Sequence, residues 1–380
     1  VSFREEISVS KVACGGAHTL AISNGKLYAW GANAYGQLGT GDSEDRFYPS
    51  EVRIQADFVE EVAGGGFHSL ALDNENQVYS WGLGDGGRLG YGSNLELEPK
   101  VIPGLRNVES IAAGHSHSGC ISVGKVYTWG IGTYGRLGHG ELKNETEPRE
   151  VELFEGKYML KLSLSFFHSG VLGMNGEVWT WGNSKNGRLG VPVSGGQPLL
   201  VPSKVGIGTQ MASLKIVDFC LGYKHGLALA KTGQIFAWGC SADGKLGFKT
   251  KSTEENIPKE VRFKAPRVNL SKEKFKLEMP LSSTTVTSVS CSEFNTYCLT
   301  DSGELLCWGT NEKGQLGNSV TDLQEDCEFQ ELKPASGFRG VNSYVPLLLD
   351  TLKHEKITTL SSSGESCIAL TTSGKVYAWG

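Results

Sequence analysis

The stretch of residues 14–39, CGGAHTLAISNGKLYAWGANAYGQLG, decides the fold because it is the first copy of a repeated unit. It starts with a glycine-rich turn ahead of a His, continues through two strand-like segments joined by Asn24-Gly25, and ends in Trp30-Gly31 and a G-x-L-G loop. Asn-Gly is a strong hairpin signal, since both residues readily adopt positive φ. The Trp-Gly pair makes seven copies in 380 residues, returning at Trp81, Trp129, Trp181, Trp238, Trp308 and Trp379.

Each copy contains four strand-like segments and no helical periodicity. In the first copy, residues 11–15, 18–22 and 26–30 form the inner three, and the last of these alternates its side chains as a half-buried strand does. A fourth segment opens at Pro49, and proline indicates an outer strand because it cannot donate a ladder hydrogen bond. The predicted fold class is therefore all-β, a seven-bladed β-propeller of four-stranded antiparallel blades.

The ends of the chain predict how the ring closes. The seventh copy stops at Trp379-Gly380 without an outer strand, whereas residues 1–7 precede the first strand and have no role in the first blade. We expect residues 1–7 to supply the outer strand of the last blade, which removes an exposed sheet edge.

The spacing favours a single domain over residues 1–380. Trp and the G-x-L-G loop are six residues apart in every copy that has this loop, and length varies only between the loop and the next copy. Two of these intervals are long, at about 248–290 and 318–360, and we interpret them as blade-linked insertions. Variable loops on a fixed framework are common sites of function.

Composition argues against several classes of protein. The formal net charge of −5 gives no reason to expect nucleic-acid binding over the whole surface, and no apolar run approaches the length of a membrane helix. No nucleophile–base pair, phosphate-cradling loop or paired carboxylates stand out, so we expect no cofactor, no metal and no covalent catalysis. The nine cysteines include no C-x-x-C pair, which favours free thiols and an intracellular location, nuclear or cytoplasmic.

With G-x-x-H, Trp-Gly and G-x-L-G at these spacings, all seven copies resemble the regulator of chromosome condensation family. The resemblance implies a propeller that binds protein partners. The regulator itself uses residues of the G-x-x-H turns, often an acid just before the His, to engage the small GTPase Ran and expel its nucleotide. Other members include a plant ultraviolet-B photoreceptor and propellers within HECT ubiquitin ligases, so the fold does not determine the activity.

The two positions before each His vary between copies and define the candidate partner-binding face. Acids occur there only at Glu293 and Glu365, in copies that lack the His, which weakens the implied exchange activity. Aromatic residues are more frequent, and they either form an exposed apolar contact surface or pack on one another over the central channel. The candidate residues are Phe67, His68, His117, Phe166, Phe167, His168, Tyr223, Lys224, His225, Glu293, Phe294 and Glu365.

The repeated Trp and His also have structural interpretations. One large aromatic residue per blade predicts packing between neighbouring sheets. One His per blade cannot form a zinc site, because ligands lie about 2 Å from the ion whereas packed sheets are about 10 Å apart. We interpret each His as tying its own turn together through a hydrogen bond to the backbone.

A basic insertion is a second candidate site. It is either a solvated loop or a contact for a phosphate backbone or an acidic partner. Its candidate residues are Lys249, Lys251, Arg262, Lys264, Arg267, Lys272, Lys274 and Lys276. Two functional hypotheses follow: a propeller that binds a protein partner, in its sharpest form an exchange factor for a Ran-like GTPase, or a non-catalytic scaffold or chromatin-associated module within a larger protein.

Overall fold

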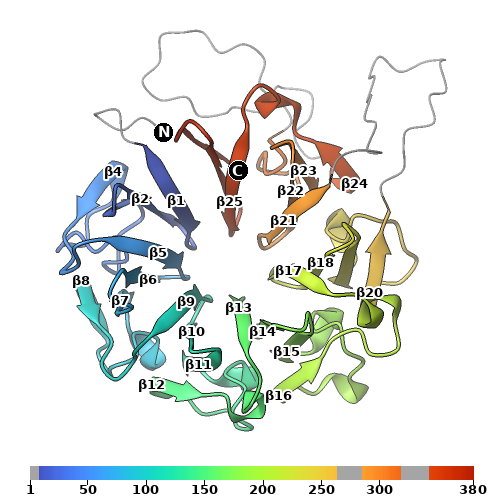
Figure 1. The fold of residues 1–380 in the computed structure, drawn as a ribbon, viewed down its shortest axis with the longest axis horizontal. Coiled ribbons are helices and arrows are strands. Elements are labelled where there is room, and N and C mark those ends of the chain that lie inside the picture. Colours follow the sequence, from blue (N-terminus) through green and yellow to red (C-terminus); the bar gives the residue numbers. More distant parts are fainter. Residues whose placement is uncertain (1–7, 263–284, 318–341) are drawn as a thin grey trace.

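The structure is a computed structural model that describes residues 8–262, 285–317 and 342–380. Seven antiparallel sheets surround a central axis (Figure 1), which confirms the predicted seven-bladed propeller. Six sheets have four strands, and the described part of the seventh has three. The predicted closing strand, residues 1–7, lies outside the described residues.

Within each blade the strands follow one another from the axis outward (Figure 1). Blades 1 to 3 are β1 (Val9–Cys14), β2 (His18–Ser23), β3 (Lys26–Gly31), β4 (Arg46–Val52); β5 (Val59–Gly64), β6 (His68–Asp73), β7 (Val78–Leu83), β8 (Leu95–Val101); and β9 (Val108–Ala113), β10 (His117–Ser122), β11 (Lys125–Gly130), β12 (Glu145–Glu150). Blades 4 and 5 are β13 (Met159–Leu164), β14 (His168–Gly173), β15 (Val178–Gly182), β16 (Leu199–Lys204); and β17 (Ile216–Leu221), β18 (His225–Ala230), β19 (Ile235–Cys240), β20 (Glu254–Val261). Blades 6 and 7 are β21 (Val286–Cys291), β22 (Asn295–Thr300), β23 (Leu305–Gly309), β24 (Ser343–Leu348); and β25 (Ile357–Ser363), β26 (Ser366–Thr371), β27 (Val376–Trp379).

Short 3₁₀ turns complete the described structure. They are η1 (Asp85–Gly87), η2 (Thr133–Gly135), η3 (Glu152–Phe154), η4 (Lys185–Gly187), η5 (Ser194–Gly196), η6 (Gln210–Ser213), η7 (Ala242–Gly244) and η8 (Asp350–Leu352). Over the described ranges, no helix has the length and apolar character needed to cross a membrane.

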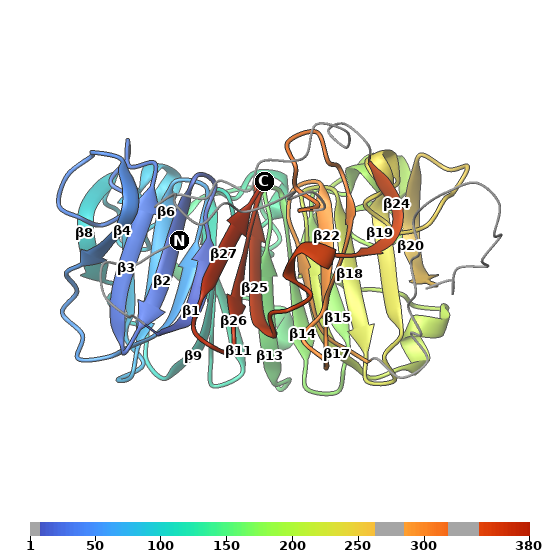
Figure 2. The ribbon, with the colours of Figure 1, turned by 90° about the horizontal axis from the view of Figure 1, so that it is seen from above.

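The strand register places the repeated motifs on one face of the ring. His18 pairs with Gly31 at one end of the β2–β3 hairpin, and the positive-φ turn of Asn24 (50°) and Gly25 (76°) closes the other end. The G-x-x-H turns and the G-x-L-G loops therefore share one face, which we call the His-turn face. Figure 2 shows this face uppermost, with the C-terminal end of β27 reaching it.

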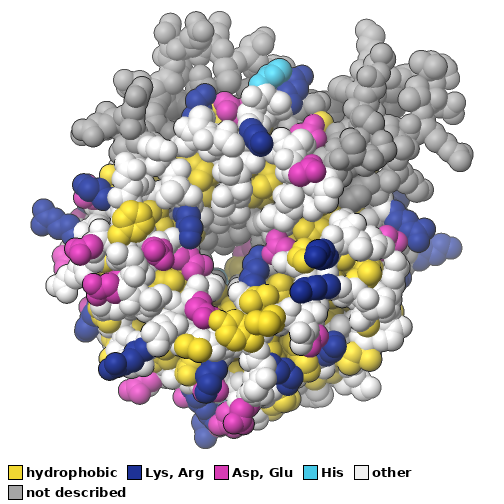
Figure 3. Space-filling view, in the orientation of Figure 1, with side chains coloured by type: hydrophobic (Ala, Val, Ile, Leu, Met, Phe, Trp, Pro, Cys, Tyr) yellow, Lys and Arg dark blue, Asp and Glu magenta, His cyan; other side chains and the backbone are white. Residues whose placement is uncertain are grey.

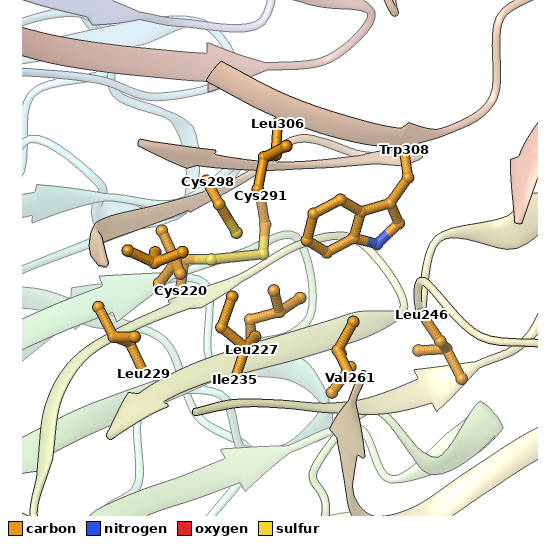
Figure 4. Close-up of a cluster of buried hydrophobic side chains, with 13 residues drawn as sticks. Cys220, Leu227, Leu229, Ile235, Leu246, Val261, Cys291, Cys298, Leu306 and Trp308 are labelled. Carbon is orange, nitrogen blue, oxygen red and sulfur yellow. A yellow bond between two sulfur atoms is a disulfide. The ribbon is translucent and has the colours of Figure 1, made fainter. Parts of the chain in front are cut away.

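The core lies between neighbouring blades and contains the repeated Trp residues, as predicted. Between blades 5 and 6 the indole of Trp308 packs with Leu227, Leu246 and other apolar side chains (Figure 4). The same cluster contains a disulfide between Cys220 and Cys291, which lie on the adjacent inner strands β17 and β21 with Cα atoms 5.7 Å apart. The expectation of free thiols was therefore wrong for these two residues, and the six other described cysteines are free.

Candidate functional site

The repeated His joins each blade to the next beneath the His-turn face. Nε2 of His18 lies 2.9 Å from the hydroxyl of Ser69 in blade 2, and that hydroxyl donates to the carbonyl of Gln37 at 2.7 Å. Trp81 Nε1 donates to the same carbonyl at 2.9 Å. Because the hydroxyl proton goes to the carbonyl, His18 donates through Nε2. We call this set of bonds the inter-blade link.

The inter-blade link recurs around the ring and corrects the predicted bond from each His to its own turn. His68, His117 and His225 contact hydroxyls of the following blade at 2.8 to 3.0 Å, and these belong to Ser118, Ser169 and Thr296. The x residue of each G-x-L-G loop supplies the carbonyl that accepts from the next Trp. These residues are Gln37, Arg88, Arg136, Arg188, Lys245 and Gln315.

The histidines of the candidate face lie under it rather than on its surface. His68, His117, His168 and His225 are each 0% exposed. Burial lowers the pKa of His18 to about 4 and that of His225 to about 3, and it holds the pKa values of the other three well below their ordinary value. At neutral pH these rings are uncharged, and no group of His, Cys, Asp and Glu in the described ranges is arranged to hold a metal ion.

The inter-blade link is incomplete between blades 4 and 5. Gly226 stands where blades 1, 2, 3, 4 and 6 have Ser or Thr, so neither ring nitrogen of His168 has a hydrogen-bond partner among the described residues. A side chain at Gly226 would lie 2.5 Å from Cζ2 of Trp238, which explains why only glycine fits. Arg188 Nη1 at the same interface is also buried, and no described residue accepts a hydrogen bond from it.

A continuous row of rings crosses the His-turn face from blade 2 to blade 6, and we call it the aromatic arc. Its central contacts are the stacked pair His115–Phe166, with centroids 4.4 Å apart, and the edge-to-face pair Phe166–Tyr223 at 4.8 Å. Every ring of the arc is half-buried. The sequence analysis allowed either an exposed contact surface or rings packed on one another. The structure shows features of both, since the rings contact one another and remain partly accessible. The arc comprises Phe67, His115, Phe166, Phe167, Tyr223 and Phe294.

Two tyrosines that the sequence analysis missed extend the aromatic arc outward. Tyr35 contacts Phe67 at 5.2 Å, and Tyr134 contacts Phe167 at 5.4 Å. Both are exposed and precede the first glycine of their G-x-L-G loops. Their shared position, directly before G-Q-L-G and G-R-L-G, is the sequence signal that could have identified them.

Cationic side chains lie directly beneath the aromatic arc. The guanidinium carbon of Arg136 is 5.2 Å from the ring centre of Phe167, and Arg136 Nη1 donates to the carbonyl of Phe166 at 2.7 Å. Arg188 lies 5.9 Å from the Phe167 ring and 5.8 Å from that of Tyr223. Burial lowers the pKa of Arg136 to about 10, which leaves it charged at neutral pH.

The inner ends of all seven blades surround a cavity of about 130 Å³ on the axis. His115, Phe166, Tyr223 and Glu293 contribute to its lining. Burial raises the pKa of the Glu293 carboxyl, and the nearby Glu365 adds to this effect. The aromatic arc therefore borders the channel, and its acidic neighbours lie on blades 6 and 7.

The predicted basic insertion is divided by the outer strand of blade 5. Lys249 and Lys251 precede β20, whereas Arg262 follows it and pairs with Glu260 at 3.2 Å. By strand register these two positions lie at opposite faces of the ring. The other candidate residues, Lys264, Arg267, Lys272, Lys274 and Lys276, lie outside the described residues.

The face opposite the His-turn face also exposes apolar side chains. Tyr158, Leu160 and Val217 are exposed near the start of inner strands β13 and β17. Figure 3 looks onto this face and shows hydrophobic side chains gathered over β13 beside the central opening. Here Tyr158 is anchored to Glu109 by a hydrogen bond of 2.5 Å.

Comparison of the sequence with known families gives a consistent result. A family described as "Regulator of chromosome condensation (RCC1) repeat" matches residues 24–72, 75–121, 123–172, 175–229 and 232–299. A second family with the same description matches residues 9–37, 59–88, 216–245 and 286–315.

Three curated relatives illustrate how widely the repeat is used. The chain is 33% identical over 323 residues to the human E3 ubiquitin-protein ligase HERC2, covering 81% of this chain and 6% of HERC2. It is 32% identical over 259 residues to the Arabidopsis thaliana ultraviolet-B receptor UVR8, covering 67% and 58% of the two chains. It is 27% identical over 364 residues to the Mus musculus secretion-regulating guanine nucleotide exchange factor, covering 93% of this chain and 59% of that factor. The chain thus spans less than two thirds of the length of each.

Solved structures share the fold. Human WBSCR16 has a TM-score of 0.77 at 22% identity, covering 95% of this chain and 85% of its own. Prp20p from Saccharomyces cerevisiae has a TM-score of 0.73 at 23% identity, covering 99% and 82%. At these identities the likeness concerns the propeller architecture alone.

Proposed function

The chain belongs to the regulator of chromosome condensation repeat family, and from this premise we propose that it is a protein-interaction propeller that binds a partner through the aromatic arc. The observation that carries the proposal is the unbroken series of ring contacts from Phe67 to Phe294, in which every ring is half-buried. Rings used only for core packing would be fully buried, as Trp81, Trp129, Trp181, Trp238 and Trp308 are between the blades.

The chemistry of the aromatic arc suits a protein surface. Large aromatic side chains with few rotatable bonds contribute most to binding when a partner covers them and excludes water. The arc is fixed from below, since Arg136 donates to the carbonyl of Phe166, so little side-chain entropy is lost on binding.

Partner capture from cell extract tests this proposal. The triple variant Phe166→Ala, Phe167→Ala, Tyr223→Ala should lose proteins that the unmodified chain retains. Phe47→Ala is the matched control, because Phe47 is exposed on the outer strand β4, away from the aromatic arc. Equal capture by the triple variant and the unmodified chain would exclude this face as the binding surface.

A second candidate function is nucleotide exchange on a small GTPase of the Ran type. Two observations favour it: a relative that covers 93% of this chain is named as an exchange factor, and Prp20p, which shares the fold, is described as having binding properties to Gsp1p and histones. Exchange requires no covalent chemistry, because contacts that favour the nucleotide-free GTPase are sufficient. Glu365 directly precedes the His position of its turn, where the resemblance to the regulator implies an acid, and Glu293 lies two residues before that position in blade 6.

Release of a fluorescent nucleotide from Ran and related GTPases tests the exchange activity. Acceleration by the chain, and its loss in the variant Glu293→Gln, Glu365→Gln, would support exchange. An unchanged release rate at micromolar chain concentration would leave the scaffold function as the proposal.

A further inference from the structure

We propose that the partner presents an acidic side chain, Asp or Glu, to the part of the His-turn face formed by blades 3 to 5. This inference rests on the proposed function, because it names the chemistry of the partner that the aromatic arc binds. The turns at 114–116, 165–167 and 222–224 and the loops at 131–138, 183–190 and 241–247 carry five cationic side chains against a single carboxylate, Asp243. The five are Arg136, Lys185, Arg188, Lys224 and Lys245.

The other side of the His-turn face has the opposite sign. The corresponding turns and loops of blades 6, 7 and 1 carry Glu293, Glu312 and Glu365 against Lys313. A partner that covers the aromatic arc therefore meets a positive region on one side and a negative region on the other. Matching potentials steer association and fix the orientation of the complex.

The two arginines of the positive region keep an uncompensated charge. Arg136 and Arg188 are each 3% exposed, and within the described residues neither forms an ion pair. Their hydrogen bonds go to neutral acceptors, the carbonyl of Phe166 for Arg136 and that of Lys185 for Arg188, and Arg188 Nη1 has no hydrogen-bond partner within residues 8–262, 285–317 and 342–380. A charge held in a low-dielectric layer acts strongly on the surface directly above it.

Two lysines supply donors that an acidic side chain can reach. Lys185 is exposed on η4, and half-exposed Lys224 holds its ammonium 5.1 Å from the ring centre of Tyr223. A carboxylate between these lysines would lie over Arg188, while an apolar neighbour in the partner would pack on Phe167 and Tyr223.

The arrangement favours an acidic peptide over a nucleic acid. A phosphate backbone is a continuous polyanion that gains affinity from a series of exposed cations. Here the arginines are covered by rings, and the carboxylates of Glu293 and Glu365 share the same face. A single Asp or Glu among apolar side chains matches both features.

Fluorescence anisotropy with two synthetic peptides tests the inference. One peptide alternates Glu with Leu, and its matched control has Gln in place of every Glu. We expect the Glu peptide to bind about tenfold more tightly or better, as charge-assisted hydrogen bonds imply. The difference should shrink in high salt, because the contacts made by exposed lysines are screened. Equal affinity of the two peptides, or no binding of either, overturns the inference.

Matched variants locate the contact. Arg188→Gln should preserve the ring, because Gln37 and Gln315 occupy the same loop position in blades 1 and 6. It should weaken binding of the Glu peptide about tenfold, and Lys224→Gln on the surface should do likewise. Arg149→Gln is the control, since Arg149 lies on outer strand β12 and pairs with Glu141 and Glu145.

The outcomes separate this inference from the proposed function. Loss of Glu-peptide binding in Arg188→Gln and Lys224→Gln, with Arg149→Gln unchanged, supports the acidic contact. If the aromatic triple variant loses partner capture while both charge variants bind the Glu peptide normally, the face is correct and the acidic contact is wrong. Displacement of the Glu peptide by a short DNA duplex would assign the region to phosphate and also overturn the inference.

Discussion

The interface between blades 3 and 4 and the one between blades 4 and 5 are built from the same repeat, but their hydrogen bonding differs. In the first, Ser169 and Trp181 both donate to the carbonyl of Arg136, at 2.7 and 2.8 Å, and His117 contacts Ser169. In the second, Gly226 has no hydroxyl, so His168 has no partner and, among the described side chains, Trp238 alone donates to the Arg188 carbonyl, at 3.0 Å. The ring therefore tolerates an interface without the His–hydroxyl bond, where the Lys161–Asp218 ion pair and the hydrogen bond from Ser165 Oγ to the carbonyl of Gly222 still join the two blades, and this interface lies beneath the centre of the aromatic arc.

The largest expected effect comes from removing the indoles. Trp181→Ala should lower the free energy of unfolding by about 4 kcal/mol, the usual cost of deleting a buried Trp side chain. Trp238→Ala should cost about 1–3 kcal/mol more, because it leaves the Arg188 carbonyl without a donor. Urea denaturation of both variants measures the difference. Equal losses would show that water or a shifted side chain satisfies that carbonyl.

Acid should destabilise the ring through its buried histidines. Their folded-state pKa values are depressed, to about 4 for His18, so between roughly pH 6.5 and that value the unfolded chain binds protons that the folded chain does not. Stability is fully present above pH 6.5 and falls as the pH decreases, by about 1.4 kcal/mol per pH unit for each such His.

The same pH effect allows a comparison of the two interfaces. Between pH 7 and pH 5, His117→Gln and His168→Gln should each reduce the loss of unfolding free energy by about 2 kcal/mol. In thermal melting this appears as a smaller decline in melting temperature over the same range. His354→Gln, at an exposed site, is the control. An unaltered decline in both variants would show that other groups cause the acid sensitivity.

Gly226→Ser tests whether the missing hydroxyl limits the second interface. The new Cβ would meet Cζ2 of Trp238 at 2.5 Å, so we expect a loss of about 2 kcal/mol from overpacking, despite the added partner for His168. Thermal melting shows whether Gly226→Ser lowers or raises the stability of the ring. A higher melting temperature would mean that the indole shifts and that the hydrogen bond is worth more than the strain.

The smallest expected effect distinguishes the hydrogen bond of His from its packing. His117→Ala removes both, whereas His168→Ala removes packing alone, because the ring nitrogens of His168 have no hydrogen-bond partner in the part of the chain that the structure describes. The first variant should be less stable by about 1 kcal/mol, the net value of one hydrogen bond. Identical denaturation midpoints would assign the role of His to packing in both interfaces.

The fold could be predicted from the sequence because its determinants are local and repeated. The Asn24-Gly25 turn and the fixed spacing from Trp to G-x-L-G both act within one blade. The inter-blade link joins residues 51 apart, such as His18 and Ser69, and which side chains meet there depends on how neighbouring sheets pack. For the same reason the disulfide of Cys220 with Cys291, 71 residues apart, was not foreseen.

The sequence predicted which turn positions form the candidate face, but not which side chains from other loops join them there. The window before each His identified Phe166, Phe167 and Tyr223, whereas Tyr35 and Tyr134 come from loops that only the folded ring brings beside them. The arginines beneath the arc were not predicted, because only the folded ring brings the x position of G-x-L-G under the turn of the following blade.

That x position has a consequence for how such propellers acquire new partners. Its carbonyl, which is common to every amino acid, holds the next blade, while its side chain sets the local charge of the His-turn face. Gln37 is neutral whereas Arg136 and Lys245 are basic, yet the bond that their carbonyls accept is the same. Under the proposed function, the charge that the face presents to a partner can therefore change one blade at a time while the architecture stays constant.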